Sequence, residues 1–300
     1  MHSTSPAVQP LRETSTVRRS LVWPRRLQRL IPALIVHGIL LVGLVFMLAP
    51  LVWMISTSLK DPAYVFNLPP QWLPQPVRWS NYAQAFQQEP LLRYFGNTAL
   101  ITGLDVVGKV ASCSLVAFAF SRLRWRGRDA LFLVMLSTLM LPPQVTLIPQ
   151  FVGYRVLGWT NTFLPLIVPN FFGGPFLTFL LRQFFMSLPH ELDAAARIDG
   201  ASTFGIFWRI ILPQARPGLA AVAIFEFTGA WNDFLGPLIY LNTPDHFTLA
   251  LGLRAFVAEW GPQWHLLMAA SLVTIFPVLL LFFLGQRYFI QGIVFSGVKG

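Results

Sequence analysis

The chain has little charge and almost no sulfur. Of its 300 residues 11% are charged, and Cys113 is the single cysteine. One cysteine excludes an intrachain disulfide and a thiolate metal site. The five histidines are scattered, with no HExxH motif and no acidic cluster beside them. We therefore predict no metal site, no catalytic residues and no enzymatic activity, because no nucleophile–base or metal-ligand set is present.

A convincing nucleotide site is also missing. Residues 103–110 match the GxxxxGK pattern, but Val110 stands where a Ser or Thr would hold the metal ion. The segment lies in the middle of an apolar run, where a phosphate-binding loop cannot form. We expect this chain to bind no cofactor, so a nucleotide that drives its function must bind to another protein.

Apolar residues are abundant and fix the class of protein. They make up 55% of the chain, and the mean hydropathy is +0.59. A helix needs about 20 apolar residues to cross a bilayer. Six stretches qualify, which predicts an all-α polytopic membrane protein. We place the six spans at residues 31–55, 95–120, 130–149, 163–181, 219–241 and 266–284.

The basic residues predict the orientation in the membrane. Residues 1–30 carry six arginines and no apolar core of a cleavable signal peptide. If this tail is cytoplasmic, 16 of the 22 Lys and Arg lie in cytoplasmic segments and five lie outside. This bias predicts that both termini are cytoplasmic. The net charge of +10 then reflects contact with anionic membrane lipid, and no nucleic-acid partner is expected.

We predict four parts along the chain. Residues 1–30 form a disordered basic tail, and 31–94 hold the first span and an outside loop rich in Pro and Trp, more suited to a rigid interfacial segment than to a helix. Residues 95–286 form a five-helix core, and 287–300 a cytoplasmic tail. Prolines and glycines in spans three and four predict kinked or partly unwound helices, which either line a pathway or serve packing alone.

Charged side chains inside the membrane need partners. Lys109 lies near mid-depth of span two, with Asp105 one turn away and Glu226 at a similar depth in span five. We predict that Lys109 pairs with Asp105, Glu226 or both. The alternative, weighed equally, is that these charges line a substrate path.

A second polar group lies further along span five, at Trp231-Asn232-Asp233. An indole beside an amide and a carboxylate suits a polyhydroxylated ligand, because the ring stacks on sugar C–H groups and the polar groups bind hydroxyls. Hydrogen bonding between helices, with the tryptophan as a bilayer anchor, is the slightly favoured alternative.

The most informative segment is the charged loop 187–213 between two apolar runs. Glu191 and Asp193 favour a helix start, and Gly200 supplies a left-handed stop. Small side chains at residues 194–196 allow a partner surface to approach closely. A second helix follows, with Phe204, Phe207, Ile210 and Ile211 at helical spacing. The pattern predicts a docking site for another protein, with acidic contacts from Glu191 and Asp193.

This loop resembles the EAA loop of ABC-importer inner-membrane permeases, whose pattern is E-A-A-x3-G-x9-I-x-L-P. The matching positions are Ala195, Ala196, Gly200, Ile210, Leu212 and Pro213, while Ala194 replaces the glutamate. Other segments between residues 30 and 300, among them 122–127 and 231–233, are similar to the carbohydrate-uptake branch, whose maltose-type permease has six spans.

The resemblance implies a type I ABC-importer permease fold in a bacterial inner membrane. It implies a second permease subunit as partner in a heterodimer, two cytoplasmic ATPase subunits that bind ATP and Mg²⁺, and an extracytoplasmic binding protein that delivers a sugar. The residues expected to couple to the ATPase are Glu191, Asp193, Ala194, Ala195, Ala196, Asp199 and Gly200. The residues expected in the path are Asp105, Lys109, Glu226, Trp231, Asn232 and Asp233.

A secondary transporter is the alternative function. It would use Lys109, Asp105 and Glu226 as an ion or proton relay. Uptake would then collapse with an ionophore and would need no ATPase.

Overall fold

The computed structural model describes residues 25–258 and 261–297, and within these ranges it is built from helices without strands. The helices are α1 (Arg25–Ser58), α2 (Ser80–Gln88), α3 (Leu91–Arg122), α4 (Arg128–Ser137), α5 (Pro143–Val156), α6 (Leu164–Ile167), α7 (Pro175–Ser187), α8 (Glu191–Ile198), α9 (Thr203–Ile206), α10 (Leu212–Gln214), α11 (Arg216–Trp231), α12 (Leu235–Tyr240), α13 (Leu249–Gly252), α14 (Ala255–Ala258) and α15 (Trp264–Gly297). Short 3₁₀ segments lie at η1 (Pro62–Tyr64), η2 (Thr138–Met140), η3 (Val168–Phe172) and η5 (Pro244–His246), and η4 (Phe207–Ile211) is a π-helix.

Four helices of the described chain are long and apolar enough to cross a bilayer, and the number of candidate spans is six if each of two bent helix pairs counts as one span. The predicted all-α polytopic fold is confirmed. The first span, Leu34–Ser58, has a mean hydropathy of 2.5 in its most apolar window, as expected of a membrane-spanning helix.

The third span departs from its predicted bounds because it is broken. Its two halves, Arg128–Met140 and Pro143–Val156, meet at an angle of 96°. The break falls at Pro142-Pro143, where two residues without backbone N–H groups cannot continue a helix.

The fifth span, predicted at residues 219–241, also differs. Its helix α11 ends at Trp231, and the chain turns before the separate short helix α12. On the other side, the helical segment Thr203–Gln214 meets α11 at 78°. The turn between Trp231 and α12 leaves Asp233 outside the regular helix, which matters for the pocket described below.

The fourth span confirms the predicted unwinding. It covers Leu164–Ser187 but contains α6, the 3₁₀ segment η3 and α7. Gly173 interrupts the helix with a φ of +87°, a conformation that a side chain would strain. The break frees backbone groups that side chains must satisfy inside the membrane.

The segment after the first span has no helix in its Pro- and Trp-rich part, residues 69–79, and becomes helical directly after it. Helix α2 forms there, and its Asn81 amide donates to the carbonyl oxygens of Ser58 and Lys60, each at 2.8 Å. The Lys60 side chain is buried with its ammonium 3.9 Å from the Trp53 ring centroid, and burial lowers the pKa of Lys60. These contacts hold α2 against the end of the first span.

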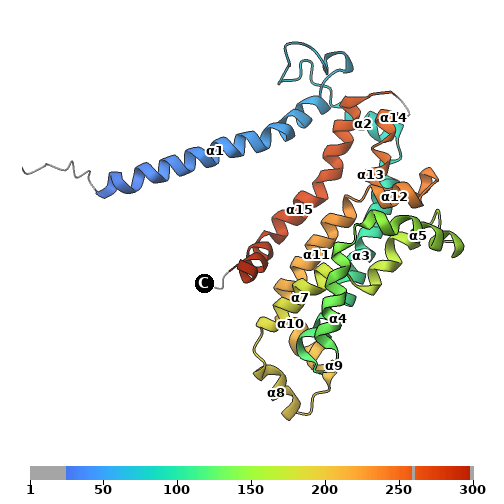
Figure 1. The fold of residues 1–300 in the computed structure, drawn as a ribbon. Coiled ribbons are helices and arrows are strands. Elements are labelled where there is room, and N and C mark those ends of the chain that lie inside the picture. The colour runs from blue at the N-terminus through green and yellow to red at the C-terminus, as the bar shows by residue number, and fades with distance from the viewer. Residues whose placement is uncertain (1–24, 259–260, 298–300) are drawn as a thin grey trace, which may run out of the picture. The chain divides into compact units, whose positions relative to one another are not determined.

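The chain divides into two units, one ending at Val52 and one starting at Trp53. In the second unit α3 packs along α7 and α11, and α11 packs against α15 (Figure 1). One buried cluster, around Leu181, Phe185 and Ile211, joins α3, α7 and the 203–214 segment. Another, around Tyr94 and Phe256, lies at the end of the unit that holds α2 and α13 (Figure 1).

We predict that Gly252→Ala destabilises the second cluster. A Cβ at Gly252 would lie 2.3 Å from the Tyr94 ring, and Tyr94 is itself 2% exposed and held in place. Overpacking of this kind costs about 1–3 kcal/mol. Thermal unfolding in detergent should show a lower melting temperature. Gly103→Ala is the matched control, because a Cβ there meets no atom within 4 Å. Equal melting temperatures for the two variants would contradict the packing argument.

Candidate functional site

The charged loop forms a short helix at one end of the second unit (Figure 1). Helix α8 has Glu191 and Asp193 in its first turn and Arg197 in its last, an order that complements the helix dipole. Gly200 has a φ of +77°, which confirms the predicted left-handed stop.

One stripe of α8 is fully open to its surroundings. Four exposed residues recur at helical spacing on this face: Glu191, Ala194, Ala195 and Ile198. Ile198 is 86% exposed, while Ala196 on the opposite face is 7% exposed and joins the core. An exposed isoleucine beside two alanines is a small apolar surface with an acid at one end.

The opposite face is held by a buried arginine. Arg122, the last residue of α3, donates to the carbonyl oxygens of Phe185 at 2.5 Å and Leu188 at 2.8 Å. Its other terminal nitrogen lies 3.1 Å from Asp193 Oδ2 and 3.0 Å from His190 Nδ1. The Arg122 side chain is 1% exposed. We call this set of contacts the arginine anchor, and it ties α3, the end of α7 and α8 together.

The arginine anchor corrects one expectation and adds a residue. Asp193 was expected to contact a partner, but its side chain is 13% exposed and turned toward Arg122. Of the two acids, Glu191 alone lies on the open stripe. Sequence reasoning assigned Arg122 no role of its own, because nothing in the sequence separates it from Arg124 or Arg126, which lie just beyond the helix end.

The second helix of the loop buries most of the predicted apolar face, with Ile210 packed against the core, but leaves Phe204 exposed. Ile206, Phe207 and Ile211 are buried, whereas Phe204 is 64% exposed. The cause is the π-helix η4 at Phe207–Ile211, because one extra residue per turn rotates the side chains that precede it relative to those that follow. The turn therefore buries Ile206 in place of Phe204.

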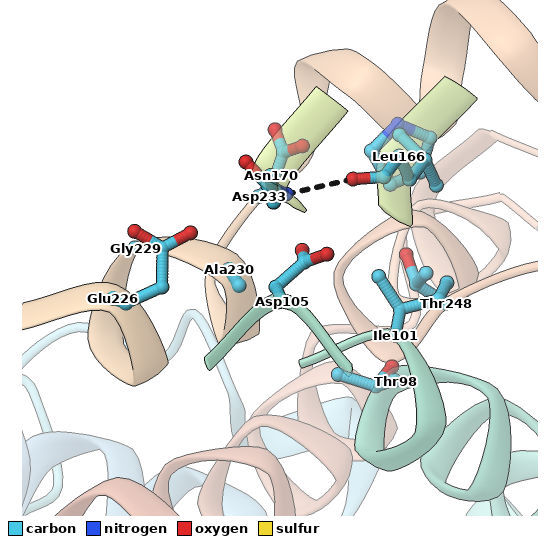
Figure 2. A pocket seen from close by; sticks show the side chains of 11 residues that line it. Thr98, Ile101, Asp105, Leu166, Asn170, Glu226, Gly229, Ala230, Asp233 and Thr248 are labelled. Atoms are coloured by element: carbon cyan, nitrogen blue, oxygen red, sulfur yellow. Dashed lines mark hydrogen bonds between the residues drawn. The ribbon is translucent and has the colours of Figure 1, made fainter. Parts of the chain in front are cut away.

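A polar cavity lies among the helices of the second unit. It has a volume of about 220 Å³ and is lined by residues from α3, α6, η3, α11 and the segment after it. Three of the lining residues are the carboxylates Asp105, Glu226 and Asp233, and Asn170 lies beside them (Figure 2). The structure thus brings together three of the six predicted path residues. We call this cavity the acidic pocket.

Lys109 does not form the predicted ion pair. Its Nζ donates to the carbonyl oxygen of Gly173 at 3.0 Å, and within the described residues no salt bridge joins it to Asp105 or Glu226. The break at Gly173 leaves a carbonyl oxygen without a helical partner, and the half-buried Lys109 ammonium satisfies it. The side chain packs on Gly174, where a Cβ would lie 3.1 Å from Nζ.

The Trp231-Asn232-Asp233 group is split by the end of α11. Trp231 is 2% exposed, and its indole N–H donates to the Thr274 carbonyl oxygen of α15 at 3.0 Å. This supports helix–helix hydrogen bonding for Trp231 rather than sugar stacking. The Asn232 amide donates to its own helix at Thr228, 2.8 Å away. Only Asp233 reaches the acidic pocket, with Oδ1 accepting from the Gly236 N–H at 3.1 Å.

An all-α membrane protein with broken spans and an exposed short helix between the fourth and fifth spans has the features of an importer permease. The chain belongs to the family described as binding-protein-dependent transport system inner membrane component, whose model matches residues 113–295. It is a transport subunit of the ABC-importer permease class, not an enzyme, and the resemblance to the carbohydrate-uptake branch is confirmed.

Two similar proteins are named for oligosaccharides. The arabinooligosaccharide permease AraQ of Halalkalibacterium halodurans is 38% identical, over 76% of this chain and 81% of its own. The diacetylchitobiose permease NgcG of Streptomyces coelicolor is 34% identical, over 85% of each. The sn-glycerol-3-phosphate permease UgpE of Yersinia enterocolitica is 33% identical, over 87% of this chain and 95% of its own.

A solved structure shares the fold. A chain of a bacterial ABC transporter involved in the import of the acidic polysaccharide alginate aligns with a TM-score of 0.78 and 23% identity, over 89% of this chain and 99% of that one. The type I importer permease fold is thereby confirmed for the described chain.

We predict that Arg122→Ala loosens α8. Removing one partner of a buried ion pair costs about 3–5 kcal/mol, because the other partner stays buried and unpaired. Amide hydrogen exchange of the purified chain should show protection in residues 191–198 falling roughly a hundredfold or more. Arg128→Ala is the control, because Arg128 pairs with the exposed neighbour Asp129. Unchanged exchange in Arg122→Ala would show that the arginine anchor does not hold the helix.

Proposed function

We propose that this chain forms half of the transmembrane path of an ATP-driven importer and that the open stripe of α8 docks a cytoplasmic ATPase. The observation that carries the proposal is α8 itself, with one face exposed and the other fixed to the spans by the arginine anchor. A helix fixed on one side and open on the other transmits a push from a partner to the spans.

Small side chains on the stripe suit close approach. Ala194 and Ala195 leave the backbone accessible, and Ile198 supplies apolar area that a partner pocket would bury. Glu191, rather than the replaced motif glutamate at position 194, supplies the acidic contact. Asp199 and Gly200 end the helix and set the direction in which the chain leaves it.

Since the sequence of this chain has no convincing nucleotide motif, we assign ATP binding to a partner protein. ATP and Mg²⁺ would bind two partner ATPase subunits, and this chain would bind no cofactor. ATP closes the ATPases, α8 moves with them, and the spans turn from inward-facing to outward-facing. Such a shift requires that ATP and the loaded binding protein both favour the outward state.

The cargo we propose is a sugar or a small oligosaccharide, delivered by an extracytoplasmic binding protein. The names of the AraQ and NgcG relatives support a carbohydrate. A second permease would complete the path, because the acidic pocket lies in one chain and a path needs walls on all sides. The basic-residue bias supports an inner-membrane orientation with both termini in the cytoplasm.

The ion-relay alternative gains no support. Lys109, which it needs as a proton or ion carrier, is committed to the Gly173 carbonyl oxygen. Membership in a binding-protein-dependent family favours the ATP-driven importer.

Ile198→Asp tests the docking surface. A charge at the centre of an apolar contact should lower co-purification of the ATPase and reduce ATP-driven uptake at least tenfold, since buried contact residues commonly contribute 2 kcal/mol or more. Ile198→Leu keeps the apolar area and should retain uptake. Wild-type uptake by Ile198→Asp, at equal permease levels in the membrane, would rule out docking on this stripe.

The cargo has its own test. The co-purified binding protein should melt at a higher temperature with one class of sugar in a panel, because a ligand that binds only the folded state stabilises it. No shift with any carbohydrate would contradict a sugar as cargo.

A further inference from the structure

The acidic pocket contains a carboxylate with an unused oxygen. Asp105 is 4% exposed, and its Oδ1 is buried without a hydrogen-bond partner within the described part of the chain. A buried, unpaired carboxylate oxygen is costly in a protein interior. The structure keeps this group facing a cavity that is large enough for far more than one water.

Figure 2 shows how the other acids lie around it. Asp105 comes from α3, Glu226 from α11, and Asp233 from the turn after α11, so three separate segments converge on one space. Glu226 and Asp233 both act electrostatically on Asp105. The convergence is a tertiary feature, because these residues are separated by more than 100 positions along the chain on the two sides of the pocket.

The nearby cation, Lys109, acts electrostatically on Asp105 and Glu226 but forms no salt bridge with either within the described residues. Lys109 donates to Gly173 and does not line the cavity. Asp233 has one oxygen occupied by the Gly236 N–H. Neither Asp105 nor Glu226 is in a salt bridge within the described residues. The lining therefore offers carboxylate acceptors and no basic side chain.

We propose that the acidic pocket binds the protonated amino group of a sugar, so that this permease carries amine-bearing sugars and rejects acidic ones. The inference rests on the proposed function as a sugar importer and adds the charge class of the cargo. Rings of carboxylates select cations in membrane pores by the same electrostatics. An ammonium group would give Asp105 Oδ1 the donor it lacks.

The surrounding residues suit the rest of a sugar. Asn170, whose amide donates to the Leu166 carbonyl oxygen at 2.8 Å, keeps its own carbonyl for a hydroxyl donor, and Thr98 and Thr248 also line the cavity. Gly229 leaves space on α11, since a Cβ there would meet nothing within 4 Å. The names of the relatives span neutral and anionic cargoes, so family membership leaves the charge open.

Binding to the full chain in lipid nanodiscs tests the proposal with three matched probes: glucosamine, N-acetylglucosamine and glucuronate. We expect glucosamine to bind about tenfold or more tighter than N-acetylglucosamine, and glucuronate weakest, because hydrogen bonds to charged groups are the stronger ones. Asp105→Asn should remove the preference for glucosamine, whereas Asp105→Glu should keep it. Asp129→Asn, at an exposed carboxylate outside the pocket, should leave it unchanged.

Equal binding of the three probes, tighter binding of glucuronate, or a preference that survives Asp105→Asn would overturn the inference. Uptake by the complex with its native partners separates this failure from that of the proposed function. Uptake of neutral or acidic sugars alone would sink the amine preference and leave the sugar importer intact. Absence of uptake for every carbohydrate would sink both.

Discussion

The buried guanidinium of Arg122 is the contact on which the rest of the molecule depends. Arg122 is the last residue of α3, the helix that packs along both α7 and α11. Its guanidinium donates hydrogen bonds to the carbonyl oxygens of Phe185 and Leu188. Through Asp193 it also holds the first turn of α8. A buried pair adds little net stability over an apolar substitute, but breaking it is costly, so it fixes geometry more than it stabilises the fold.

This geometry joins the two functional regions through one helix. Helix α3 carries Arg122 at its C-terminal end and Asp105 in the wall of the acidic pocket. Under the proposed function, a displacement of α8 would reach the helix that lines the pocket without an intervening flexible loop. The breaks in the neighbouring spans, at Pro142 and Gly173, would be places where those spans can bend.

Polar side chains inside the spans bond backbone groups that the helix breaks leave without a partner. The unwound segment at Gly173 exposes a carbonyl oxygen, and Lys109 supplies its donor. The turn after α11 leaves the Gly236 N–H free, and Asp233 accepts from it. Asp105 is the exception, because its Oδ1 has no hydrogen-bond partner within the described residues.

Local signals in the sequence were reliable where the physics is local. Hydropathy located the six spans, because crossing a bilayer requires an apolar helix of fixed length. The glycine at position 200 and the acids before it defined α8. The predicted helix ends were wrong where a span is broken. Residues 219–241 stay apolar past Trp231, so hydropathy gives no sign that the helix ends and the chain turns there.

The hydrogen-bond partners of the polar groups inside the spans could not be predicted from the sequence. Spacing offered Asp105 as a partner for Lys109, but the unwound backbone at Gly173, created by a different span, competes for the same ammonium. In the same way an arginine at a helix end looks like a lipid-facing charge until α7 and α8 close around it. The sequence by itself determined the membrane class, the spans and helix α8, and tertiary structure alone decided which polar atoms meet, because those contacts join segments far apart in the chain.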